Sequence, residues 1–253
     1  MKKYLAAGIV SFLILFSGCP SSSSSLPELT PPDWQAGETA LYEIVRNDSV
    51  LFTRTITLDF DEEGAIPIVV ITNVVRSESA LYYFFDSTTF ALTRYTLKPV
   101  WSTRTVITEI SITEVEAEFE SDAVHLKKTT VDSKEEKTLP LSAHGYGIEM
   151  LQQLFRAIPL DPGLSFRIDV VVPLEFRVVP TNVTVLGTKL VATPLGDILC
   201  REVRAQAPRR SIRLLYELAQ PHRLIAIHDL ENNTETRLVE FSLPEPDTLL
   251  PHS

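Results

Sequence analysis

The run from Asp59 to Gly64, Asp-Phe-Asp-Glu-Glu-Gly, has the residue types with which a calcium-binding loop begins. In such a loop, carboxylate oxygens ligate the ion, a glycine at the sixth position allows a sharp turn, and a bidentate glutamate at the twelfth position closes the site. The twelfth position here is Val70. Because the strongest ligand is missing, we interpret the run as the solvated turn of a β-hairpin.

No other spacing predicts a metal site, a cofactor or a catalytic centre. No two histidines are four residues apart, the spacing that places two zinc ligands on one face of a helix, and no Cys-x-x-Cys motif joins them. The five are His125, His144, His222, His228 and His252. A Gly-x-Ser-x-Gly motif and a phosphate-binding glycine loop are also absent. A general base whose partners converge only in space stays open as an alternative.

The aromatic run Leu81-Tyr82-Tyr83-Phe84-Phe85 could bind an apolar molecule. In a strand, alternate side chains point to opposite faces, so Tyr83 and Phe85 would share one face and could line an apolar groove. The alternative is a strand buried on both faces.

Five arginines between positions 201 and 213 form a basic cluster in an acidic chain: Arg201, Arg204, Arg209, Arg210 and Arg213. A guanidinium group binds a carboxylate or phosphate through paired hydrogen bonds. Arg204 and Arg210 are therefore candidate ligand contacts. The alternative is a solvated hairpin tip with local salt bridges.

Cys19 is the residue with the most specific chemistry. Lys2 and Lys3 precede an apolar run from Tyr4 to Phe16, which is shorter than the about 20 residues that span a bilayer. The sequence Leu15-Phe16-Ser17-Gly18-Cys19 resembles the lipobox of bacterial lipoproteins, although Phe16 stands where that motif prefers Leu. We predict a signal peptide over residues 1–18 and acylation of Cys19; an ordinary secretory signal with a chance cysteine is the alternative.

Residues 19–33 are rich in Ser and Pro and are expected to form a tether about 40 Å long when extended. The predicted partner is therefore a membrane, reached through lipid on Cys19, with the protein facing the periplasm. Pro20 is not the Asp associated with retention at the inner membrane, which favours the outer membrane. Removing Lys2 and Lys3 changes the formal charge from −10 to −12, which argues against nucleic acid or anionic lipid headgroups as partners of the whole surface; local basic patches stay open as an alternative.

The elements that must position these residues are mostly strands. Runs of alternating Val, Ile, Thr and aromatic residues, such as Ile66 to Val75 and Glu175 to Leu186, are separated by short turns, which predicts an antiparallel, strongly curved or wrapped sheet. Apolar residues recur at helical spacing between 147 and 158, predicting one central amphipathic helix whose Leu151, Leu154 and Phe155 are buried. The helix joins β-halves at about 34–140 and 164–242, within a domain over 34–242. A Pro-rich tail at 243–253 is expected to be disordered, and Cys200 is expected to be a buried thiol.

Short motifs across this domain resemble the envelope family catalogued as domain of unknown function 3108. They are Trp34-Gln35-Ala36-Gly37-Glu38, Leu41-Tyr42-Glu43-Ile44, Leu154 to Leu160, Val185-Leu186-Gly187, Thr193 to Cys200, Pro221 to Ile227 and Thr236 to Phe241. The resemblance implies an exported, β-rich protein with one central helix. It supplies no catalytic residues.

We therefore expect a membrane-anchored protein without catalytic activity that serves as a structural or protein-interaction module of the envelope. A carrier or sensor of a lipid or other apolar ligand is the first alternative, with Tyr83, Phe85, Leu151, Phe155, Arg204 and Arg210 as its candidate contacts. A hydrolytic enzyme is the second. A cavity of several hundred Å³ beside the helix would favour the carrier. A flat apolar patch over a filled core would favour the interaction module, and a buried carboxylate–histidine pair in a cleft would favour the enzyme.

Overall fold

The computed structural model describes residues 25–77 and 82–244, whose strands form a single fifteen-stranded sheet. The strands of the first half are β1 (Thr39–Arg46), β2 (Ser49–Glu63), β3 (Ile66–Ser77), β4 (Phe84–Thr93), β5 (Pro99–Thr108), β6 (Ile112–Phe119), β7 (Ala123–Thr130) and β8 (Lys134–Pro140). Those of the second half are β9 (Gly145–Gly147), β10 (Ser165–Val172), β11 (Arg177–Thr193), β12 (Gly196–Ala207), β13 (Arg210–Glu217), β14 (Leu224–Asp229) and β15 (Thr234–Ser242). Two short helices, α1 (Leu151–Leu154) and the 3₁₀ helix η1 (Pro173–Glu175), interrupt the second half.

The strand order joins the two predicted halves into one sheet. It runs from β8 back to β1, crosses to β15, and then runs back to β9, so that the first and last strands lie side by side at the centre. There Thr39 pairs with Ser242. Neighbouring strands are antiparallel, as predicted, except that β9 pairs with β10 in parallel. The sheet is strongly curved but not closed, because β8 and β9 are its two edges.

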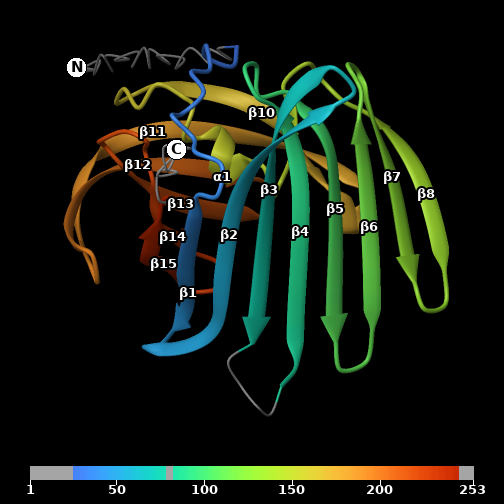
Figure 1. The fold of residues 1–253 in the computed structure, drawn as a ribbon, viewed down its shortest axis with the longest axis horizontal. Coiled ribbons are helices and arrows are strands. Elements are labelled where there is room, and N and C mark those ends of the chain that lie inside the picture. Colours follow the sequence, from blue (N-terminus) through green and yellow to red (C-terminus); the bar gives the residue numbers. More distant parts are fainter. Residues whose placement is uncertain (1–24, 78–81, 245–253) are drawn as a thin grey trace, which may run out of the picture.

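Alternation along the strands determines which side chains face the concave side of the sheet. In β2, Arg54, Ile56 and Leu58 are buried and point to the inside, whereas Thr57 and Asp59 between and beyond them are exposed. The second half curves behind the first and the sheet wraps around α1 (Figure 1). The hairpin turn predicted for the run Asp59 to Gly64 is confirmed only at its end, because β2 continues to Glu63 and the turn to β3 consists of Gly64 and Ala65. Edge strand β8 carries a run of exposed Lys and Glu side chains, which discourages pairing with another chain.

The prediction of a twelve-residue amphipathic helix is wrong, since only Leu151–Leu154 is regular α-helix. The segment begins instead as strand β9, where Gly145 and Gly147 pair with β10. From Met150 to Ile158 the chain is buried on nearly all sides, including Gln153 and Arg156, so its polar residues do not form a solvated face. The burial predicted for Leu151, Leu154 and Phe155 is confirmed, with exposed fractions of 4%, 0% and 0%.

The described part of the predicted tether packs on the core instead of extending freely. From Leu26 onward the chain packs on the core through Leu26 and Leu29, and Pro32 is buried. The backbone N–H of Thr30 donates a 2.8 Å hydrogen bond to the carbonyl of Ala157. Prolines exclude helix here but not burial, so composition alone overestimated the free segment. Over the two described stretches of chain, no helix has both the length and the apolar character needed to cross a lipid bilayer.

Candidate functional site

An open cavity of about 780 Å³ lies on the concave side of the sheet. Side chains from β10 to β15 form most of its wall, with Ile44 from β1 and Arg54 from β2 completing it. Ile148, Leu151 and Gln152 contribute from the segment around α1. The aliphatic part of the wall comprises Ile44, Ile148, Leu151, Val170, Val172, Val179, Ala205, Ala207, Ile212 and Ile227. This volume falls within the about 300–1,000 Å³ that is usual for small-molecule sites.

The wall is built from inward positions of successive strands that face one another. On β15, Thr236 lies between Ile44 of β1 and Ile227 of β14. Ile212 of β13 lies between Asp229 and Ala205. Such cross-strand neighbours have their side chains on the same face, and period-2 alternation therefore places a largely apolar surface around an open space.

Polar groups occur at two levels of the cavity. At the level of α1, Arg54 donates from Nε to Asn73 Oδ1 and from Nη2 to Gln152 Oε1, each at 2.6 Å. Gln152 is held in turn because the hydroxyl of Tyr216 donates to its carbonyl at 2.9 Å. Near the strand ends, Arg210 Nη2 donates to Asp229 Oδ2 at 2.8 Å. Burial raises the pKa of Asp229, but hydrogen bonds from Asn232 and Arg210 outweigh that effect and the net shift is downward.

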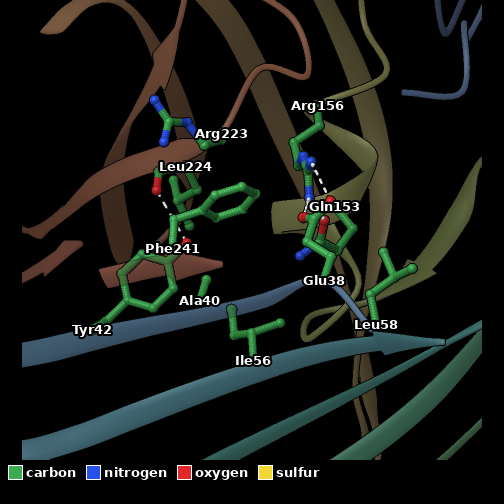
Figure 2. Close-up of a pocket in the computed structure, with 10 residues that line it drawn as sticks. All are labelled: Glu38, Ala40, Tyr42, Ile56, Leu58, Gln153, Arg156, Arg223, Leu224 and Phe241. Carbon is green, nitrogen blue, oxygen red and sulfur yellow. Dashed lines mark hydrogen bonds and ion pairs between the residues drawn. The ribbon is translucent and has the colours of Figure 1, made fainter. Parts of the chain in front are cut away.

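A second group of polar side chains lies in the core and encloses almost no space. Figure 2 shows Arg156, which donates to Glu38 Oε1 at 2.7 Å and to Gln153 Oε1 at 3.0 Å. Its Nε donates to the carbonyl of Pro221 at 3.3 Å. Arg156 and Glu38 are 4% and 5% exposed, and the gap beside them is only about 10 Å³. We interpret this ion pair as a structural link between the start of β1, the α1 segment and the turn before β14.

A third polar cluster faces the concave side of β4 and β5. Arg104 donates to both carboxylate oxygens of Asp86, at 2.9 and 2.6 Å. Ser102 and Arg104 are close enough to lower the pKa of Glu149, although within the described residues no hydrogen bond of standard geometry reaches its buried carboxyl oxygens. Burial raises the pKa of Glu149 and so favours its neutral form.

Two of the six ligand contacts predicted from sequence, Leu151 and Arg210, line the cavity. Phe155 is completely buried in the core and does not reach it. Arg204 lies on the opposite face of β12 from the inward residues Val203 and Ala205.

The predicted aromatic groove does not form around Tyr83 and Phe85. Tyr83 precedes β4 and is 55% exposed. Phe85 is half-buried on the outer face, where the guanidinium of Arg76 lies 5.7 Å from its ring centre. The strand is not buried on both faces either, so neither interpretation of the aromatic run describes it fully.

The arginine cluster is dispersed into local pairs, as its alternative interpretation proposed. Arg213 lies 3.4 Å from Glu202, and Arg201 donates to the carbonyl of Leu186. Arg209 and Arg210 are at the β12–β13 turn and line the mouth of the cavity. No convergent anion site is made by the five together.

The remaining chemical candidates lie apart. His125 pairs with Glu120 at 3.2 Å on the surface. None of the described residues that line the cavity is a histidine. Cys200 is buried, and burial raises the pKa of its thiol to about 11, as expected for a structural cysteine. Within residues 25–77 and 82–244, no three His, Cys, Asp or Glu side chains lie close enough to hold a metal ion. Cys19 and His252 lie outside the described residues.

Sequence reasoning missed Arg54 and Gln152. The cue for Arg54 was present, because it occupies the inward position of the alternating run Thr53-Arg54-Thr55-Ile56-Thr57-Leu58. A charged residue in the apolar stripe of a strand requires a partner or a function. For Gln152 no such cue exists, since its role depends on how the α1 segment meets the sheet.

Comparison with known proteins identifies a similar fold and no function. No protein-family model and no curated protein sequence matches the chain. A solved structure of a beta-barrel-like protein of domain of unknown function DUF1849 from Brucella abortus has a TM-score of 0.54 at 14% identity, covering 84% of this chain and 100% of that one.

Two further solved structures have lower TM-scores. One, from Parabacteroides distasonis, is named as a candidate lipoprotein and has a TM-score of 0.36 at 8% identity, covering 86% of this chain and 100% of that one. The other, from Bacteroides fragilis, is named as a candidate exported protein with a YmcC-like fold and has a TM-score of 0.32 at 9% identity, with the same coverage. At these scores neither carries an argument about this chain.

Proposed function

We propose that this chain is a lipid-anchored envelope protein that binds an amphipathic small molecule in its inner cavity, as a carrier or sensor. The single observation that carries the binding proposal is the open space of about 780 Å³ with a mainly aliphatic wall. Lipid anchoring is supported by the sequence around Cys19. We propose the outer membrane as the location and the periplasm as the compartment that the protein faces.

This proposal replaces the interaction module as the preferred function. A flat apolar patch over a filled core would have favoured that module, whereas the sheet is hollow beside α1. We propose binding without catalysis; the two carboxylates of the lining, Glu175 and Asp229, are each paired with an arginine.

The test uses a neutral fluorescent probe, N-phenyl-1-naphthylamine, with the purified full-length protein. We expect saturable binding that hexadecan-1-ol displaces. Thr236→Phe should weaken it, because this half-buried side chain lies between Ile44 and Ile227 on the cavity wall and a phenyl ring would take up part of the space. The matched control is Glu235→Phe, on the same strand but exposed on the other face.

Thermal unfolding of each variant checks that the sheet is intact. The proposal is contradicted if the wild-type protein shows no saturable probe binding, or if folded Thr236→Phe binds the probe as tightly as Glu235→Phe does.

A further inference from the structure

Arg54 is a positive charge in an otherwise apolar inner stripe. It lies on β2 next to the inward position of Ile56, is 8% exposed, and lines the cavity. Burying a charge is costly unless an opposite charge or a set of hydrogen bonds compensates for it. The surroundings of Arg54 therefore indicate what it is placed to bind.

The contacts of Arg54 leave its charge without a counter-ion. An arginine has five N–H groups. Two of them reach neutral amide oxygens, on Asn73 and Gln152. Nη1 makes no hydrogen bond with the described part of the chain, and no described carboxylate lies within 4.0 Å of the guanidinium. The ring of Tyr42, 5.8 Å away, offers only a weak cation–π contact.

The acidic groups nearest to Arg54 do not neutralise this region. Asp86 is close enough to influence Arg54 but is held by both arms of Arg104. Burial raises the pKa of Glu149, which is not among the groups that act on Arg54. Burial also lowers the pKa of Arg54, yet a guanidinium stays protonated at neutral pH. Among the described residues, Asp86 is therefore the carboxylate that acts on Arg54, and both of its oxygens are already bound by Arg104.

We propose that Arg54, positioned by Asn73 and Gln152, binds the carboxylate or phosphate headgroup of a single-chain anionic amphiphile whose hydrocarbon chain lies along the aliphatic cavity wall. The inference rests on the proposed function and adds the ligand's charge and orientation. The headgroup is held deep, at the level of α1, and the chain extends toward the mouth between β12–β13 and β14–β15. Guanidinium geometry suits both oxyanions.

The arginines at the mouth do not offer an equivalent site. Arg210 is paired with Asp229 and Arg177 with Glu175. Arg209 is exposed, where water weakens the attraction to an anion. An anionic headgroup therefore gains more binding free energy at Arg54 than at the mouth. We propose a single hydrocarbon chain because two chains would have to share a volume of about 780 Å³.

The test measures displacement of N-phenyl-1-naphthylamine from the full-length protein by three sixteen-carbon probes: hexadecanoate, monohexadecyl phosphate and hexadecan-1-ol. Wild type should bind at least one anion about ten- to a hundredfold more tightly than the alcohol, the range expected for hydrogen bonds to a charged group. Arg54→Met should lose this preference and still bind the alcohol. Arg76→Met, an exposed arginine on neighbouring β3, is the matched control and should keep it.

Asn73→Asp provides a second variant that keeps Arg54 in place. The new carboxylate would lie within 2.6 Å of Arg54 Nε and supply its counter-ion, so the variant should fold at least as stably as wild type and bind the anions about tenfold more weakly. The two anions distinguish a fatty-acid-like from a phospholipid-like headgroup. This inference is overturned, while the cavity proposal stands, if wild type binds the two anions no more tightly than the alcohol and Asn73→Asp binds all three probes as wild type does. If none of the three displaces the fluorescent probe, both proposals are contradicted.

Discussion

Buried charges are held in three different ways in this protein. Glu38 and Arg156 neutralise each other at 2.7 Å, and Asp86 and Arg104 do the same. Arg54 is solvated by amides and faces open space. Glu149 has no ion pair among the residues described, and Ser102 and Arg104 offset only part of the effect of burial on its pKa, so the stability of the protein should depend on pH through this residue.

We predict that Glu149 makes the folded protein less stable as pH rises. Because burial raises its pKa, the folded state retains the proton at pH values where the unfolded chain, near the ordinary value of 4.5, has lost it. The stability of wild type should therefore decrease, relative to Glu149→Gln, as pH rises from about 4.5 to the folded-state pKa. Urea denaturation of both proteins between pH 4 and 8 measures the difference.

Glu118→Gln, at an exposed position on β6, reports the effect of removing a surface carboxylate. A stability difference between wild type and Glu149→Gln that is the same at every pH would show that Glu149 is not buried as described.

Residue identity alone predicted part of the site. Leu151 was identified because helical spacing marks its buried side, although the helix itself is short. Arg210 was identified because charge clusters are visible in a sequence. Gln152 and Glu149 could not be predicted, since their environments are created by strands β2 to β5, which are distant in sequence.

At the scale of elements, the segment between β8 and β10 departs most from expectation. Its apolar spacing predicted a helix from 147 to 158, but Gly147 pairs with β10 as the end of β9, residues 148–150 form a turn, and the helix is confined to Leu151–Leu154. Gly145 permits this, because a Cβ there would lie 2.2 Å from Leu141 Cγ. Periodicity detects which side chains are buried and not which backbone hydrogen bonds form, so burial was predicted correctly and the element was not.

Phe155→Ala should lower the free energy of unfolding by about 3–5 kcal/mol, the cost of removing a large side chain from filled core. Phe155 is completely buried and does not line the cavity, so no existing space lessens that cost. Chemical denaturation measures it. Tyr83→Ala, at a 55% exposed position, is the control and should change stability by about 0.5 kcal/mol or less. An unaltered Phe155→Ala protein would mean that the segment is packed differently.

At the scale of the whole molecule, strand content and curvature followed from the sequence, whereas the cavity did not. Alternation identifies inward side chains on each strand, but the space they enclose depends on how far the sheet curves and on what fills it. The first half is filled by large residues such as Phe90 and Leu92. Inward Thr and Ala residues on β11, β12 and β15 leave the second half hollow.

The anchor is tested by Cys19→Ala. The variant should stay unacylated and uncleaved, because the only other cysteine, Cys200, is buried far along the chain. Detergent-phase partitioning and intact mass measure both effects. Cys200→Ala is the matched control and should be processed as wild type. A Cys19→Ala protein that still partitions into detergent and lacks residues 1–18 would exclude the lipoprotein assignment.

The pairing of β1 with β15 has a consequence for how the protein is made. The central ladder of the sheet joins Thr39 to Ser242, so it cannot form until almost the whole chain has been synthesised. Closing so long a loop delays folding relative to the hairpins on either side. Until then β1 presents an unpaired edge, which other strands can join. In the exported protein that we propose, this edge would have to be protected until β15 arrives, and a chain that ends before β15 would keep it exposed.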